Sequence, residues 1–172
     1  FYGIPANYWT ATIEQKKSPV LMDELTRQHY QFGIYASAEL LMPPFNLNVF
    51  RTVKNLQVKT PGKTVYDRDE KITQQFQQFL ESTKKTQQPF FSFLFYDAAH
   101  GFCESGNPVH LFQPAAKTCS RLLVTSKTDP TPYLNRYKNS LHYIDTLVAR
   151  DLKELEKNNL LNKTIVIITG DH

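Results

Sequence analysis

The apolar run FFSFLFY at residues 90–96 is the feature that most restricts the fold of this chain. A strand with one face in water alternates apolar and polar side chains, whereas this run is apolar at nearly every position. Such a continuous run, directly after Pro89, is typical of a central strand that is covered on both faces. We therefore expect the chain to fold around a sheet with other elements packed against both of its faces.

Helix and strand patterns alternate on either side of this run. Ser18 is expected to cap a helix, and a short strand is expected at residues 31–37. Asp67 is expected to cap a second helix that ends near Lys84, and the strand at residues 90–96 follows it. The order is therefore helix, strand, helix, strand, which argues for parallel strands joined by right-handed crossovers.

The clearest helix starts at Thr131 and ends at Asn158, and its apolar residues recur at steps of three and four. These residues are Tyr133, Tyr137, Leu141, Ile144, Val148, Leu152 and Leu155. After a short turn, the β-branched run at residues 164–169 is expected to form a third strand. We predict an α/β fold with a mostly parallel sheet flanked by helices.

The composition restricts the partners only modestly. The formal net charge of +4 would favour anionic partners such as phosphate groups, nucleic acid or an acidic membrane face, but a solvated basic surface is the simpler explanation. The basic residues are scattered, and no basic stripe with interleaved aromatic residues predicts nucleic-acid binding. No apolar stretch is long enough to predict a membrane span. The six glycines form neither a GxGxxG motif nor a P-loop.

Two cysteines, Cys103 and Cys119, fall in a long irregular stretch at residues 97–130. Two thiols cannot complete a tetrahedral zinc site alone, and their spacing is not CxxC. The pair is therefore either a disulfide or two ordinary thiols, and the sequence leaves both possibilities open. A disulfide would imply an oxidising compartment.

Two of the expected strands end in polar residues. In open α/β sheets, ligands bind beyond the carboxyl ends of the strands. Asp97 and His100 follow the second strand, and Asp171 and His172 follow the third. A carboxylate oxygen and a neutral imidazole suit a divalent cation, and Gly170 would let Asp171 and His172 turn toward one point.

Each of these pairs also has a plainer interpretation. Asp171 could cap a following helix with His172 incidental, and Asp97 and His100 could belong to a turn that simply ends a strand. Two ligands never complete a metal site, so further ligands would have to come from elsewhere. No G-x-S-x-G nucleophile elbow is present.

The segment NRYKNSLHYIDTLVARDLKELEKNNLLNKTIVIITGDH at residues 135–172 resembles the sulfatase and alkaline-phosphatase-like superfamily. Its members carry a long helix followed by a strand that ends in Asp-His. The run FFSFLFY with Asp97 and His100 is similar to the strand and loop that place a substrate-side histidine. With FYGIPANYW at the start and TDPTPYLNRY at residues 128–137, the chain looks most like the periplasmic domain of the PbgA/YejM group, which are inner-membrane sulfatase-like proteins of Gram-negative bacteria.

The resemblance implies an alkaline-phosphatase/sulfatase-like fold and hydrolysis of a sulfuric or phosphoric ester, or phosphoryl-group transfer. It places Asp171 and His172 in the pocket of a divalent metal ion (Mn, Zn, Mg or Ca), which would neutralise charge on the transferring group. It places His100, with Asp97, on the substrate side.

The same resemblance implies a Thr, Ser or modified Cys nucleophile. The resemblance places this nucleophile on a segment before Phe1 and further metal ligands after His172. Neither cysteine of the chain lies in the Cys-x-Pro-x-Arg context of a modified sulfatase cysteine. Residues 1–172 are therefore expected to be a partial sulfatase-like domain that is inactive alone.

The resemblance also supports a second expectation, a domain that binds or senses anionic lipid such as cardiolipin or lipid A without catalysis. Its expected location is the periplasmic side of the bacterial inner membrane, with transmembrane segments outside these residues. The expected partners are thus an anionic lipid or a phosphate or sulfate ester, and the membrane, but not nucleic acid.

Overall fold

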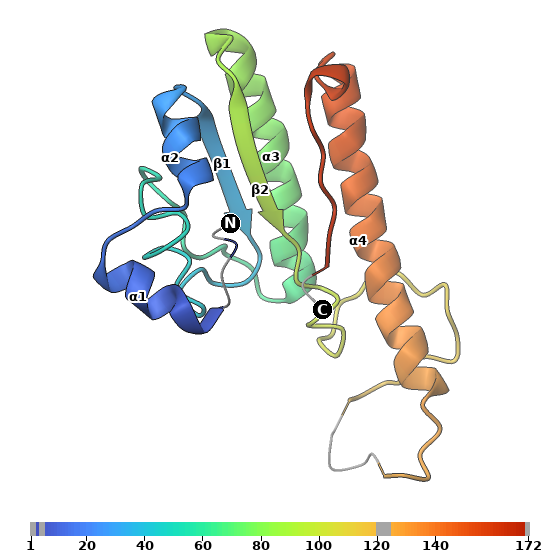
Figure 1. Ribbon diagram of the computed structural model, residues 1–172. Coiled ribbons are helices and arrows are strands. Elements are labelled where there is room, and N and C mark those ends of the chain that lie inside the picture. The colour runs from blue at the N-terminus through green and yellow to red at the C-terminus, as the bar shows by residue number, and fades with distance from the viewer. Residues whose placement is uncertain (1–2, 4–5, 120–124, 171–172) are drawn as a thin grey trace.

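The computed structural model describes residues 3, 6–119 and 125–170, and Figure 1 shows how its elements are arranged. Along the chain these elements are η1 (Ala6–Tyr8), α1 (Trp9–Glu14), α2 (Val20–Arg27), β1 (Gln31–Ala36), α3 (Val65–Thr86), β2 (Phe90–Phe95), α4 (Thr131–Lys157) and η3 (Leu161–Lys163). The predicted alternation of helix and strand is confirmed through α4. None of the helices in the part of the chain that the structure describes is long and apolar enough to cross a membrane.

β1 and β2 pair in parallel, with Gln31 opposite Phe90 and Ala36 opposite Phe95. Alternate side chains of the two strands therefore point to opposite faces of the sheet. Phe32, Ile34 and Ala36, with the odd-numbered phenylalanines of β2, join a core formed with α2 and the loop at residues 40–56. The other face packs against α3 and the end of α4, so both faces of the sheet are covered, as predicted.

α3 lies close against the sheet because Gly33 of β1 has no side chain. A Cβ atom on Gly33 would lie 2.8 Å from the ring of Phe79, which is too close for any other residue without rearrangement. The N-cap of α3 is Thr64 rather than the predicted Asp67. Asp67 is its partner in a capping box: its carboxylate accepts from the Thr64 N–H at 3.0 Å, and its own N–H donates to the Thr64 hydroxyl.

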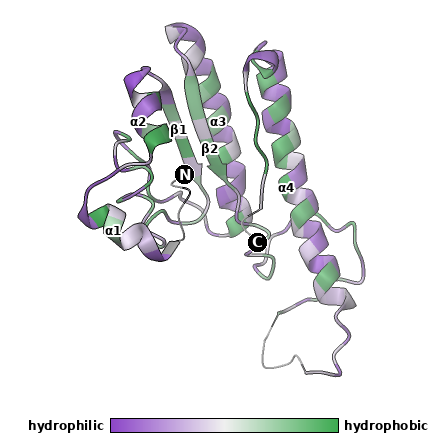
Figure 2. Cartoon of the chain, in the orientation of Figure 1, coloured by the Kyte–Doolittle hydropathy of each residue, from purple (hydrophilic) through white to green (hydrophobic). Residues whose placement is uncertain are grey.

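The predicted third strand does not join the sheet, which has two strands in the described residues. Residues 164–170 run beside α4 in Figure 1 without assigned strand pairing, and Ile165 and Ile167 are 90% and 82% exposed. Figure 2 shows this exposed segment in the green of hydrophobic residues along most of its length. A β-branched run favours an extended backbone, but it forms a strand only when the edge of another strand is available for pairing.

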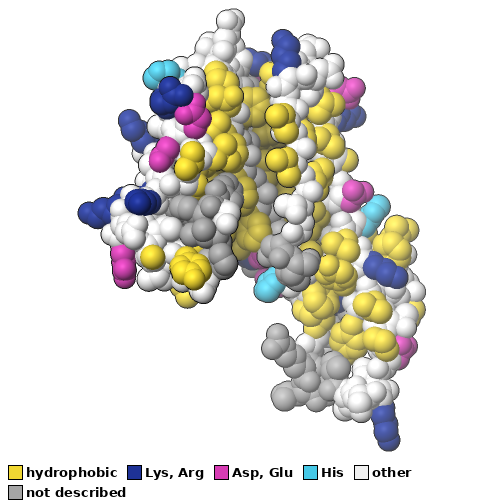
Figure 3. Space-filling view, in the orientation of Figure 1, with side chains coloured by type: hydrophobic (Ala, Val, Ile, Leu, Met, Phe, Trp, Pro, Cys, Tyr) yellow, Lys and Arg dark blue, Asp and Glu magenta, His cyan; other side chains and the backbone are white. Residues whose placement is uncertain are grey.

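The buried face of α4 coincides only in part with its regularly spaced apolar residues. Its buried residues are Asn135, Asn139, Ser140, Tyr143, Leu147, Asp151 and Leu155, whereas Tyr137 and Leu141 are exposed. Figure 3 shows the resulting group of hydrophobic side chains on the surface near the N-terminal half of α4. Polar side chains are buried instead because the loop that packs on this half of α4 presents backbone groups that need hydrogen-bond partners.

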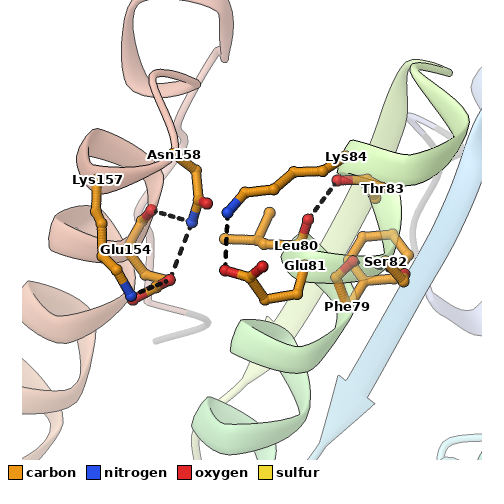
Figure 4. Close-up of polar contacts among 9 residues, drawn as sticks. All are labelled: Phe79, Leu80, Glu81, Ser82, Thr83, Lys84, Glu154, Lys157 and Asn158. Atoms are coloured by element: carbon orange, nitrogen blue, oxygen red, sulfur yellow. Dashed lines mark hydrogen bonds and ion pairs between the residues drawn. The ribbon is translucent and has the colours of Figure 1, made fainter.

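At its other end, α4 lies beside α3, and both helices carry charged side chains there (Figure 4). Lys84 pairs with Glu81 on α3 at 2.9 Å, and Lys157 pairs with Glu154 on α4 at 3.2 Å. Asn158 also donates to Glu154. Both ion pairs therefore lie within one helix, and this end of the helix pair lies away from the carboxyl ends of the strands (Figure 1).

Candidate functional site

The two parallel strands end at the same edge of the sheet, and the chain after β2 turns there. The Ser37 N–H donates to the Phe95 carbonyl at 2.9 Å, which extends the strand pairing by one residue. The Gly101 N–H donates to the Asp97 carbonyl at 2.8 Å and closes the turn at residues 97–101. In this turn Ala98 is fully buried, Asp97 is half-buried and His100 is exposed. Both residues that were predicted for the substrate side thus lie in one turn at the carboxyl edge.

A carboxylate that sequence reasoning missed holds the start of this turn. Asp69 of α3 is fully buried, and its two oxygens accept hydrogen bonds from consecutive N–H groups, those of Asp97 at 3.0 Å and Ala98 at 2.9 Å. Burial raises the pKa of Asp69 to about 6, although Ser37 and the two N–H groups favour the charged form. The available signal was its position, three residues before Ile72 on the buried face of α3.

A second buried carboxyl group lies behind the turn. Tyr96, the residue after β2, donates its hydroxyl proton to Asp151 of α4 at 2.5 Å, and its oxygen lies 2.7 Å from the Thr73 hydroxyl. Burial raises the pKa of Asp151 to about 7. Burial and the negative charge of Asp151 together raise the pKa of Tyr96. The hydrogen bonds between Thr73, Tyr96 and Asp151 thus link α3, the end of β2 and α4 next to the carboxyl edge of the sheet.

The long loop after the turn is fixed on α4 by one arginine. The guanidinium of Arg136 donates to five backbone carbonyls at 2.6–3.1 Å, those of Phe102, Cys103, Glu104, Ala116 and Lys117. Asn139 binds the backbone of Phe112 through both its N–H and its C=O group. Cys103 and Cys119 are joined in a disulfide that links the same two arms of the loop.

The described residues do not by themselves provide the ligands of a metal ion. Within residues 3, 6–119 and 125–170, no group of three His, Cys, Asp or Glu side chains could hold one. Both cysteine sulfurs are used in the disulfide. The predicted ligands Asp171 and His172 lie outside the described residues.

Comparison with known proteins assigns the chain to a family. The model of the sulfatase family matches residues 2–172. An uncharacterized protein of Haemophilus influenzae is 27% identical over 172 residues, which is all of this chain and 23% of that protein. The chain therefore spans about a quarter of the length of this relative.

Proposed function

Since this chain belongs to the sulfatase family, we propose that it forms part of a domain that hydrolyses sulfate or phosphate esters with a divalent metal ion. Proteins of this family act on sulfate esters and generally depend on a metal. The activity belongs to the longer protein, because the chain spans only about a quarter of the relative. The proposal includes phosphoryl-group transfer, in which an acceptor other than water receives the group.

The observation that supports this proposal is the turn at residues 97–101. It follows a parallel strand at the carboxyl edge of the sheet, which is where open α/β sheets bind their ligands. His100 is exposed there, so its imidazole is free to donate a hydrogen bond to an oxygen of the ester. We propose that Asp97 lies on the substrate side of the same site. Asp171 and His172 are the residues of this chain that we propose as metal ligands.

The test uses the full-length protein with Mn²⁺ or Zn²⁺ and an aryl sulfate or aryl phosphate as substrate. His100→Ala should lower kcat/KM by about 10- to 100-fold, because one positioned hydrogen-bond donor is lost. Asp171→Asn should abolish cleavage and weaken metal binding in calorimetry. His142→Ala is the matched control, because His142 is an exposed histidine on α4. Full activity of His100→Ala or Asp171→Asn would count against the proposal.

A second candidate function is binding of anionic lipid without catalysis, in an inner-membrane protein of the PbgA/YejM type. The net charge of +4 favours it. The disulfide supports a periplasmic location, because disulfides persist in oxidising compartments. Under this alternative, the full-length protein binds vesicles that contain cardiolipin, Asp171→Asn and His172→Ala leave that binding unchanged, and neither ester is cleaved.

A further inference from the structure

We propose that Asp69 is a positioning residue for the site, because it fixes the backbone of the turn that carries Asp97 and His100. The inference rests on the proposed function for its effect on catalysis. Its structural part, that α3 holds this turn, stands on the contacts alone.

The first support is the match between acceptor and donors. The two oxygens of Asp69 accept from two consecutive N–H groups, at 3.0 and 2.9 Å. Asparagine cannot replace this contact, because it has one acceptor oxygen and its amide N–H₂ would face an N–H group. A buried carboxylate is expensive to keep in a core, and here it is fully buried. Its two hydrogen bonds to the turn are charge-assisted and therefore stronger than those of a neutral acceptor.

The second support is at the other end of the turn, which also rests on α3. A Cβ atom on Gly101 would lie 2.8 Å from a methyl group of Val65, the first residue of α3. The N–H of Val65 in turn donates to the Glu104 carboxylate at 2.7 Å, three residues beyond Gly101. One helix therefore holds the turn both before and after His100.

As a consequence, the exposed side chain of His100 is attached to a backbone whose position is fixed. If the hydrogen bonds to Asp69 are lost, the turn can shift, and a shift of about 1 Å at a reacting group lowers the rate by as much as about 100-fold. The effect should fall on kcat more than on KM, because the turn positions the reacting ester and contributes little to the strength of ground-state binding.

The experiment compares Asp69→Asn with Asp151→Asn in the full-length protein. Asp151 is the matched control, since it is also a buried carboxyl group but contacts Tyr96 instead of the turn N–H groups. Amide hydrogen exchange at Asp97 and Ala98 should speed up on the order of tenfold or more in Asp69→Asn and stay unchanged in Asp151→Asn. The kcat for the aryl ester should fall about 10- to 100-fold in Asp69→Asn only, with KM within about threefold of the wild-type value.

A double-variant cycle separates positioning from general loss of structure. Asp69→Asn should have little further effect in a His100→Ala background, because its effect passes through His100. If Asp69→Asn does not fold, Gly101→Ala disturbs the same turn from its other end and should show the same pattern. Unchanged amide exchange at Asp97 and Ala98 in Asp69→Asn overturns the inference, whatever the activity. The inference also fails if the reductions in kcat caused by Asp69→Asn and His100→Ala multiply in the double variant. A wild-type protein that cleaves neither ester but shows the exchange pattern overturns the proposed function and leaves the holding of the turn by Asp69 intact.

Discussion

The short turn after β2 and the long loop that follows it are held in opposite ways. The turn is held by an acceptor, the Asp69 carboxylate of α3, which receives two backbone N–H groups. The loop is held by a donor, the Arg136 guanidinium of α4, which donates hydrogen bonds to five backbone carbonyls. Asp69 is fully buried, whereas several of the Arg136 contacts lie at the surface. The loop also has the Cys103–Cys119 disulfide.

This difference indicates how each region should respond to damage. The start of the turn depends on one side chain within the core, because loss of Asp69 removes the acceptor of the Asp97 and Ala98 N–H groups. The loop has several hydrogen bonds and a covalent link, and water can reach part of it. We therefore expect the turn to respond as part of the core and the loop to respond locally.

The largest expected effect is that of Asp69→Ala. It should lower the free energy of unfolding by about 2–4 kcal/mol, because the half-buried N–H of Asp97 and the buried N–H of Ala98 lose their acceptor. Urea denaturation of the full-length protein measures this loss, with the exposed Asp145→Ala as control. A loss equal to that of the control would remove the contrast between the two regions.

Arg136→Met should have a smaller global effect, about 1–2 kcal/mol, because part of the site is open to water and the disulfide still joins the two arms of the loop. The main result should be faster proteolytic cleavage within residues 102–117. Adding a reductant should increase the effect of the substitution, since the arms then lose their second link. Lys153→Met, which changes an exposed residue of α4, is the control, and equal cleavage of both variants would contradict the assignment of Arg136 as the anchor.

A third prediction concerns pH and the two buried carboxyl groups behind the turn. Their folded-state pKa values, about 6 for Asp69 and about 7 for Asp151, lie above the value of 3.8 for an unperturbed Asp. The folded state therefore binds protons more tightly than the unfolded state, and the stability that these groups contribute below pH 4 is lost as the pH rises through 6 to 7. Asp151→Asn should remove about 1–3 kcal/mol of this decline between pH 5 and 8, measured by denaturation at each pH. An unchanged pH profile in Asp151→Asn would contradict the assignment.

The smallest expected effect belongs to the ion pair between α3 and α4. Arg150 binds Glu70 through two hydrogen bonds, at 2.6 and 2.9 Å, but both side chains are partly exposed. Glu70→Gln should therefore cost about 0.5 kcal/mol, and added salt should reduce the difference from wild type. Glu81→Gln, which breaks a pair within one helix, is the control. A salt-independent loss above about 2 kcal/mol would show that this pair acts as a buried one.

The elements that were predicted well from the sequence are those whose signals are local. The run at residues 90–96 and the spacing of apolar residues in α4 depend on neighbours a few positions away. Asp67 was mistaken for the cap of α3 because both members of a capping box are polar and lie three residues apart. The third strand at residues 164–169 was overpredicted, since strand pairing depends on a partner that the local pattern does not contain.

The candidate site was predicted only in part for a related reason. Asp97 and His100 were found because they directly follow a strand, and they do lie together in the turn. Asp69 and Arg136 were missed because their partners are backbone groups, which every residue carries and no sequence motif marks. The buried Asn135 and Asn139 were missed because helix faces are read from apolar spacing.

The exposed segment after η3 has a practical consequence for handling the protein. Ile165, Val166, Ile167 and Ile168 form a β-branched run with little cover, and they include some of the most exposed large hydrophobic side chains of the described chain. An extended, uncharged apolar segment of this kind pairs readily with a copy of itself. Concentrated samples of residues 1–172 alone should therefore self-associate and precipitate through this segment, despite the net charge of +4.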